Sequence, residues 1–141
     1  MANSLSAAIK ATVRELEMIK QDLIISHQVT MYEIGEQLVY QTPLKTGLAS
    51  NNWNVTADDT TEPEREAGFE GGKGLSSLNA ISYQVKDLYK KPESLFYNPV
   101  DYIWDLEAGS SRQAPNGIVT PTVPQVENIW IDNLQKNGII K

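Results

Sequence analysis

The first 41 residues carry apolar side chains at spacings of three and four, which places them on one face of an α-helix. We expect a single helix from Ser4 or Ser6 to Tyr40. Pro43 should stop it, because the residue before a proline is pushed out of the helical region. The apolar positions of this face are Ile9, Val13, Leu16, Ile19, Leu23, Met31, Ile34 and Leu38.

A helix of this length has consequences for assembly. At a rise of about 1.5 Å per residue it would span ~50 Å, which exceeds the width of a compact domain of this size. Part of it must therefore lie against something else, and a neighbouring copy of the chain is the simplest candidate. The alternative is a break near Ser26 and His27 that gives two shorter helices. His27 itself falls on the apolar face, where we expect a hydrogen-bonded core or interface residue rather than a ligand.

Alternating apolar and polar residues follow a turn at residues 42–47 and predict a strand with one buried face, carried by Trp53, Val55 and Ala57. Residues 57–74 are acidic, rich in glycine and poor in apolar side chains. They read either as a flexible acidic loop or as a hairpin. A second short strand is expected at residues 94–97. Two strands alone make a marginal sheet, so we expect one or two more.

Two further helices are expected. Apolar residues at spacings of three and four predict one at residues 77–89. The other should begin at a capping box formed by Thr122 and Gln125 and end at Gly138. Its apolar stripe consists of Val126, Ile129, Trp130 and Leu134. The sum is an α+β domain with a long N-terminal helix and two or three further helices packed on a small antiparallel sheet.

Residues 98–117, NPVDYIWDLEAGSSRQAPNG, combine turn-forming residues with large apolar side chains. We expect a short helix over residues 101–108, capped by Asp101 and ended by Gly109. An ordered surface loop should follow over residues 110–117, closing with a tight turn at residues 115–117. A plain solvated loop has no use for adjacent large apolar side chains, so this stretch is the main candidate for a functional surface.

Composition narrows the function classes. The chain has 141 residues, a net charge of −6 and no cysteine, which fits a single domain over residues 1–141 without disulfides or thiolate metal sites. Spread acidic residues argue against gripping nucleic acid, which needs clustered Lys and Arg. No segment approaches the ~20 apolar residues of a membrane span, and no signal peptide is visible.

No set of residues forms a convincing catalytic or cofactor site, so we expect neither an enzyme nor a bound metal or cofactor. One histidine cannot make a two-histidine metal site. Ser110 and Ser111 lack the G-x-S-x-G context of a nucleophile. Asp101, Asp105 and Glu107 could imitate paired catalytic carboxylates, but such spacing is common in ordinary helices. Nucleotide-binding glycine motifs are absent.

Two segments resemble a known family. LEAGSSRQAPNG at residues 106–117, preceded by Asn-Pro and Tyr, is similar to a signature of the tail-completion (neck) proteins of long-tailed phages, which include minor tail protein Z of lambdoid phages. TPLKTGLASNNW at residues 42–53 resembles a second segment of that family. The resemblance spans roughly residues 42–134. The sequence departs from the family at Lys45, where an acidic residue is frequent, and over residues 57–74.

The resemblance implies a structural virion protein of the phage neck, assembled in the host cytoplasm. It implies a homo-oligomeric ring, most often a hexamer, between head connector or adaptor proteins and the tail terminator or tail tube. DNA would pass through its lumen without specific contacts, and an acidic lining would repel the phosphates. The alternatives are the tail terminator that caps the tube and, in another class, a small soluble protein-binding module.

Polar and aromatic side chains of residues 98–117 are our candidates for the contact between subunits. We expect Trp104 and Tyr102 to anchor the loop from beneath. Glu107 and Arg112 can pair either across a subunit boundary or within one subunit, where they would only brace the loop. The full set of candidates is Tyr102, Trp104, Glu107, Ser110, Arg112, Gln113 and Pro115.

Overall fold

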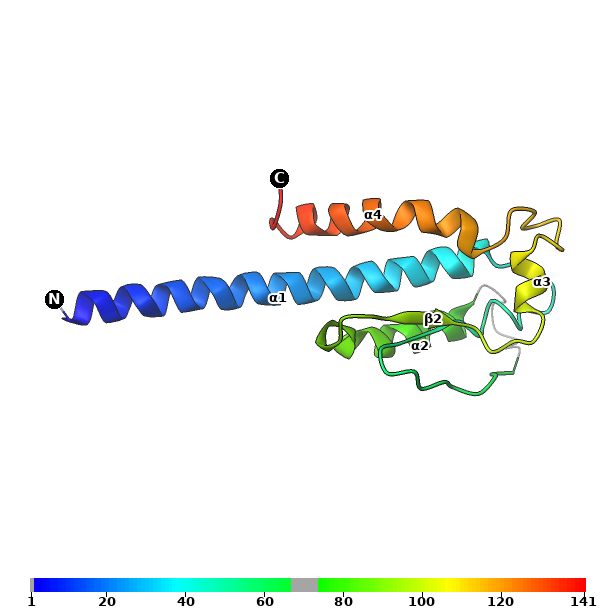
Figure 1. Cartoon of the computed structure of the whole chain (residues 1–141), viewed down its shortest axis with the longest axis horizontal. Coiled ribbons are helices and arrows are strands. Elements are labelled where there is room, and N and C mark those ends of the chain that lie inside the picture. The colour runs from blue at the N-terminus through cyan, green and yellow to red at the C-terminus, as the bar shows by residue number, and fades with distance from the viewer. Residues whose placement is uncertain (1, 67–73) are drawn as a thin grey trace.

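One face of the long first helix organises the fold. The computed structural model describes residues 2–66 and 74–141, which form an α+β arrangement of helices around a two-stranded antiparallel sheet (Figure 1). In chain order the elements are α1 (Ala2–Gln41), β1 (Asn54–Thr56), α2 (Leu75–Gln84), the 3-10 helix η1 (Val85–Lys90), β2 (Leu95–Tyr97), α3 (Ile103–Glu107) and α4 (Val119–Lys136).

The first helix runs unbroken through Ser26 and His27, so the alternative of two shorter helices is wrong. Within the helix the Ser26 hydroxyl donates to the Asp22 carbonyl one turn back, at 2.8 Å, so this polar group is satisfied without leaving the helix. The helix ends at Gln41, two residues before Pro43 as expected. The Thr42 hydroxyl donates to the Leu38 carbonyl at 2.6 Å and so satisfies an acceptor of the last turn.

The C-terminal half of α1 lies between two layers (Figure 1). On one side α4 runs antiparallel to it, with the Asn133 amide donating to the Thr30 hydroxyl at 3.0 Å. On the other side lie α2 and η1, where Gly35 allows Ile81 to approach α1 closely. The core between the layers consists of Ile34, Leu38, Val39, Trp53, Val55, Ile81, Val85, Leu88 and Ile118.

Strands β1 and β2 pair in the register Asn54 with Tyr97 and Thr56 with Leu95. All three residues of β1 are buried, so the expected single buried face is wrong. On its second face the Arg65 guanidinium donates to the Asn54 side-chain oxygen, and the Thr56 hydroxyl donates to the Asp58 carboxylate. Further strands are not found in residues 57–66 or 74–141, and the rest of the predicted hairpin region, residues 67–73, lies outside the described part of the chain.

The starts of α3 and α4 differ from the sequence predictions. The expected cap Asp101 makes no side-chain bond to the helix, which starts at Ile103. The capping box is also wrong, since Thr122 and Gln125 lie inside α4 and donate to carbonyls one turn back. Gly138, with φ at +72°, ends α4 as predicted.

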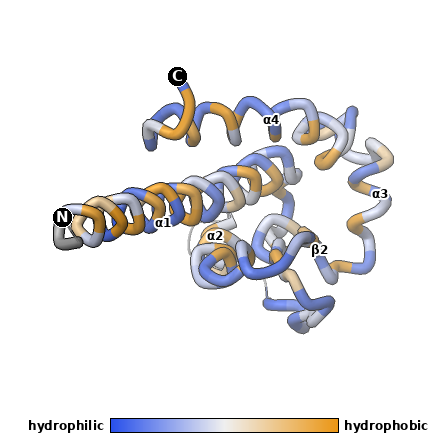
Figure 2. Tube along the Cα trace, turned by 60° about the vertical axis from the view of Figure 1, so that its left-hand side comes forward, coloured by the Kyte–Doolittle hydropathy of each residue, from blue (hydrophilic) through white to orange (hydrophobic). Residues whose placement is uncertain are grey.

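The N-terminal half of α1 extends past every other described element (Figure 1). We call residues 2–23 the overhang. Hydrophobic positions recur along it (Figure 2). Their exposure is large, for example 66% for Leu5 and 61% for Leu16. No helix of the described residues is long and apolar enough to cross a membrane.

Candidate functional site

Residues 42–53 and residues 106–117 meet in space. Gln113, in the loop after α3, bonds twice to Leu44, in the turn after α1. Its side-chain amide donates to the Leu44 carbonyl at 3.1 Å, and its side-chain oxygen accepts from the Leu44 N–H at 2.8 Å. A side chain that satisfies both polar groups of one backbone residue fixes the two loops against each other.

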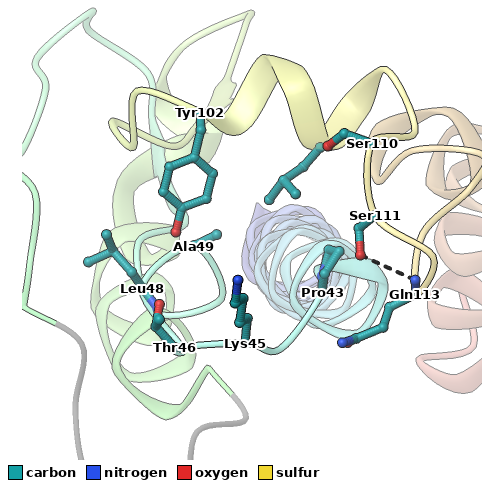
Figure 3. A pocket seen from close by; sticks show the side chains of 11 residues that line it. Pro43, Lys45, Thr46, Leu48, Ala49, Tyr102, Ser110, Ser111 and Gln113 are labelled. Atoms are coloured by element: carbon teal, nitrogen blue, oxygen red, sulfur yellow. Dashed lines mark hydrogen bonds between the residues drawn. The ribbon is translucent and has the colours of Figure 1, made fainter.

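An open cavity of about 530 Å³ lies between these loops. Figure 3 shows Tyr102 and Ser110, from either end of α3, on one side of it and Lys45 and Thr46 on the other. Ser111 accepts a hydrogen bond of 3.2 Å from the Gln113 N–H at its edge. The cavity is lined by Pro43, Lys45, Thr46, Gly47, Leu48, Ala49, Tyr102, Leu106, Ser110, Ser111 and Gln113. The structure therefore brings Tyr102, Ser110 and Gln113, three of the predicted contact residues, to one cavity.

Glu107 makes a contact that the sequence did not predict. Its carboxylate accepts from the N–H groups of Ile118 and Val119, each at 2.7 Å, and from the N–H of Thr120 at 3.1 Å. The Thr120 hydroxyl adds a fourth bond of 2.7 Å. These donors are the free N–H groups at the start of α4, where a negative charge is favoured. Glu107 therefore caps a helix from a separate element.

The pKa of Glu107 reflects this cap. Desolvation by burial acts to raise the pKa, but the hydrogen bonds from the Thr120 side chain and from the three backbone N–H groups outweigh it and lower the pKa below its ordinary value. The carboxylate is thus held in its charged form. The alternative in which Glu107 pairs with Arg112 inside one chain is wrong, since no ion pair joins these two residues in the described part of the chain.

The two predicted aromatic anchors, Tyr102 and Trp104, differ in burial. Tyr102 is half-buried at the cavity, whereas Trp104 is 80% exposed and so does not support the loop from beneath as predicted. Arg112 and Pro115 are exposed on the loop surface. An exposed tryptophan is unusual for an isolated chain and is typical of surfaces that meet another protein.

The loop at residues 110–117 adopts a defined backbone conformation, as predicted. Gly109 and Gly117 have φ values of +90° and +86°, and an added Cβ would lie 2.5 Å from the carbonyl oxygens of Pro115 and Glu107 respectively. Only glycine adopts this backbone without strain. The Gly117 N–H donates to the Ala114 carbonyl at 3.1 Å, which closes the predicted tight turn.

Arg65 is a structural residue that the sequence prediction missed. Its guanidinium donates to the Asn51 and Trp53 carbonyls, each at 2.9 Å, and to the Asn54 side-chain oxygen at 2.7 Å. Its own N–H donates to the Asn52 side chain at 2.6 Å. The available signal was a lone arginine in an acidic tract that follows three closely spaced asparagines. Residues 57–66 are therefore fixed to β1 at this point.

Asp58 organises the other end of that tract. Hydrogen bonds from the Thr60 side chain, the Thr56 side chain and the Thr60 N–H, given in decreasing order of effect, lower the pKa of Asp58 to about 2. Such a carboxylate turn is a local structure of the kind that asparagine and aspartate form readily. It stabilises the connection between β1 and the residues that lead to Arg65.

The carboxylates and the histidine that could have formed a catalytic or metal site do not come together. Asp101 and Asp105 are exposed, while Glu107 is occupied at α4. We predicted a hydrogen-bonded His27, but its Nδ1 has no hydrogen-bond partner among the described residues. The ring packs edge-on against Trp130, with the two ring centroids 6.4 Å apart, and burial lowers the pKa of His27. Within residues 2–66 and 74–141 no cluster of three or more potential metal ligands is found.

No protein-family model, curated protein or solved structure matches the chain.

Proposed function

We propose that the chain is a structural protein of a tailed-phage neck, a subunit of a ring that completes the tail and joins it to the head connector. The observation that carries the proposal is the double hydrogen bond between Gln113 and Leu44. It unites the two segments of family resemblance, which are 69 residues apart at this contact, into one surface. Two segments that serve one contact with another protein are expected to lie together in the fold.

Two features of the described chain fit an assembly role. The overhang exposes a continuous row of large apolar side chains from Leu5 to Leu23. Extended exposed apolar surfaces of this kind mark contacts with other proteins. Trp104 and Arg112 stand exposed next to the loop cavity, and both residue types are enriched where protein interfaces are strongest. In a head-to-tail ring, this surface would repeat against a different surface of the next copy.

Location tests the function directly. Purified particles of the phage that encodes the chain should contain the protein, and a particle map should place it between the head connector and the tail tube. Density at the distal limit of the tube alone would assign it to the terminator instead. Absence from particles would overturn the proposal.

The subunit contact is tested by exposed substitutions. In rings released from purified particles, Trp104→Ser and Arg112→Ala should each reduce the ring to smaller species in native mass spectrometry, without changing the circular dichroism spectrum of the free protein. Tyr83→Ser is a matched control, because Tyr83 is also an exposed aromatic but lies on α2, away from the loop. A ring that survives both loop substitutions would place the contact elsewhere.

A further inference from the structure

The apolar face of the overhang continues a face that the chain itself covers further on. Ser26 and Thr30 lie on the same helical face as Leu16, Ile19 and Leu23, at the next positions of the repeat. There α4 covers them, with the Asn137 amide donating to the Ser26 hydroxyl at 2.8 Å and the Asn133 amide to Thr30. Beyond Ser26, towards the N-terminus, α4 has ended (Figure 1) and the face is open.

We propose that the overhang of a second copy covers this open face, running antiparallel to the first. The direction follows from α4. A copy running parallel and in register would bring its own α4 to the level of Ser26, on the side that faces its partner, where the two α4 helices would collide. An antiparallel copy reaches that level with its N-terminus instead, so it continues the track of α4, which itself runs antiparallel to α1.

The register follows from the spacing of the apolar residues. In heptad terms one set of core positions is Ile9, Leu16 and Leu23, and the other is Leu5, Thr12 and Ile19. An antiparallel pair opposes one set to the other. All six core positions are used when each faces the partner residue whose number, added to its own, gives 28. The pairs are then Leu5 with Leu23, Ile9 with Ile19, and Thr12 with Leu16. This register also brings residue 2 of the partner level with Ser26, where the cover by α4 begins.

The size of the contact is sufficient for a dimer. The large side chains of this face are 40% to 66% exposed. Their exposed area amounts to roughly 600 Å² per copy, or about 1,200 Å² for the pair, which is the lower end of specific interfaces. The sum of 28 applies to the core positions; on each flank, positions of the same heptad type adjoin each other, offset by about two residues. Val13 therefore adjoins Val13 of the partner on one flank. On the other flank Glu15 adjoins its own counterpart, and this exposed like-charge contact costs little because salt and water screen it.

The inference rests on the self-association in the proposed function but describes a different state. An antiparallel pair has a two-fold axis perpendicular to the helices, whereas a ring between head and tail has two different faces and cannot repeat that axis. The pair is therefore a form of the free protein, and it must open when the protein enters a neck. Opening exposes the overhang to another chain at the time of assembly.

Cysteine crosslinking tests the arrangement, because the chain has no cysteine of its own. The double variant Ile9→Cys/Ile19→Cys should form a disulfide-linked dimer on oxidation. The two sites are about 15 Å apart along one helix, too far for a disulfide within a chain. Each single variant should remain unlinked, as should the control Ile9→Cys/Met18→Cys, since Met18 lies on the opposite face. Linkage of both single variants would instead show a parallel pair and overturn the proposal.

Sedimentation of the full chain gives a second measurement. The wild type should be a dimer at micromolar concentration. Leu16→Glu should weaken it on the order of 100-fold, since Leu16 occurs twice in the pair. Met18→Glu should leave it unchanged, because this residue is equally exposed but faces away. A wild-type monomer at tens of micromolar would overturn the inference.

Incorporation separates the inference from the proposed function. The disulfide-linked dimer should be excluded from particles and re-admitted after reduction. If the protein crosslinks as a pair but is absent from all particles, the inference is supported and the neck function is overturned. If the protein is located in the neck but is monomeric when free, the neck function is supported and the inference is overturned.

Discussion

Glu107 and Ile118 lie 11 residues apart and are joined by a hydrogen bond of 2.7 Å, in which the Ile118 N–H donates to the carboxylate. This contact and its neighbours on Val119 and Thr120 hold the first turn of α4 against α3. Because α4 is the layer that covers the C-terminal half of α1, the cap supports the whole arrangement.

Replacing this cap should destabilise the protein. In Glu107→Gln the side chain keeps one accepting oxygen but turns an NH₂ group towards N–H donors and loses its charge. We expect a loss of about 1–2 kcal/mol in the free energy of unfolding, measured by urea denaturation. Asp105→Asn is the control, since Asp105 is exposed two residues earlier, and it should change stability by less than about 0.5 kcal/mol. Equal effects in both variants would argue against the cap.

Acid should weaken the same contact. The folded pKa of Glu107 lies below its ordinary value of 4.5, so its contribution to stability is fully present above that pH and is lost as the pH falls through the folded pKa. The thermal midpoint of the wild type should therefore fall between roughly pH 5 and pH 3 more steeply than that of Glu107→Gln. Parallel curves for the two proteins would show that other groups dominate the acid response.

Arg65 should be essential for the order of residues 57–66. Arg65→Leu removes three side-chain donors and leaves the Asn51 and Trp53 carbonyls unpaired. We expect a loss of about 2–4 kcal/mol in the free energy of unfolding and faster cleavage of this segment in limited proteolysis. Arg65→Lys should be intermediate, because one ammonium cannot reproduce the planar fork. Lys136→Leu, at an exposed position of α4, should leave both measurements unchanged.

Gln113 should control the coupling of the two loops around the cavity. Gln113→Leu keeps the size of the side chain but removes both bonds to Leu44. We expect a loss of about 1 kcal/mol in stability, together with faster hydrogen exchange of the Leu44 N–H. Gln125→Leu is a control of the same type within α4 and should leave the exchange rate of Leu44 unchanged. Slow exchange in both variants would show that the loops are held by other contacts.

Local signals in the sequence determined several parts of this fold. The unbroken α1 follows from a continuous apolar spacing without proline, and its end follows from Pro43. The left-handed positions at Gly109, Gly117 and Gly138 follow from glycine's freedom in that region. Strand β2 was placed correctly because its neighbours carry turn residues. In each case the deciding interactions lie within a few residues, so periodicity and turn chemistry are enough to find them.

The tertiary structure alone decided where polar side chains act. Glu107 caps a helix 11 residues away, Arg65 bonds back to residues 11 to 14 earlier, and Gln113 reaches across 69 residues to Leu44. A carboxylate, guanidinium or amide carries no local sign of its distant partner, because many orientations satisfy it equally in water. Only the packing of α4, β1 and the loops selects one, and so the sequence determined the helices while the fold assigned the contacts between them.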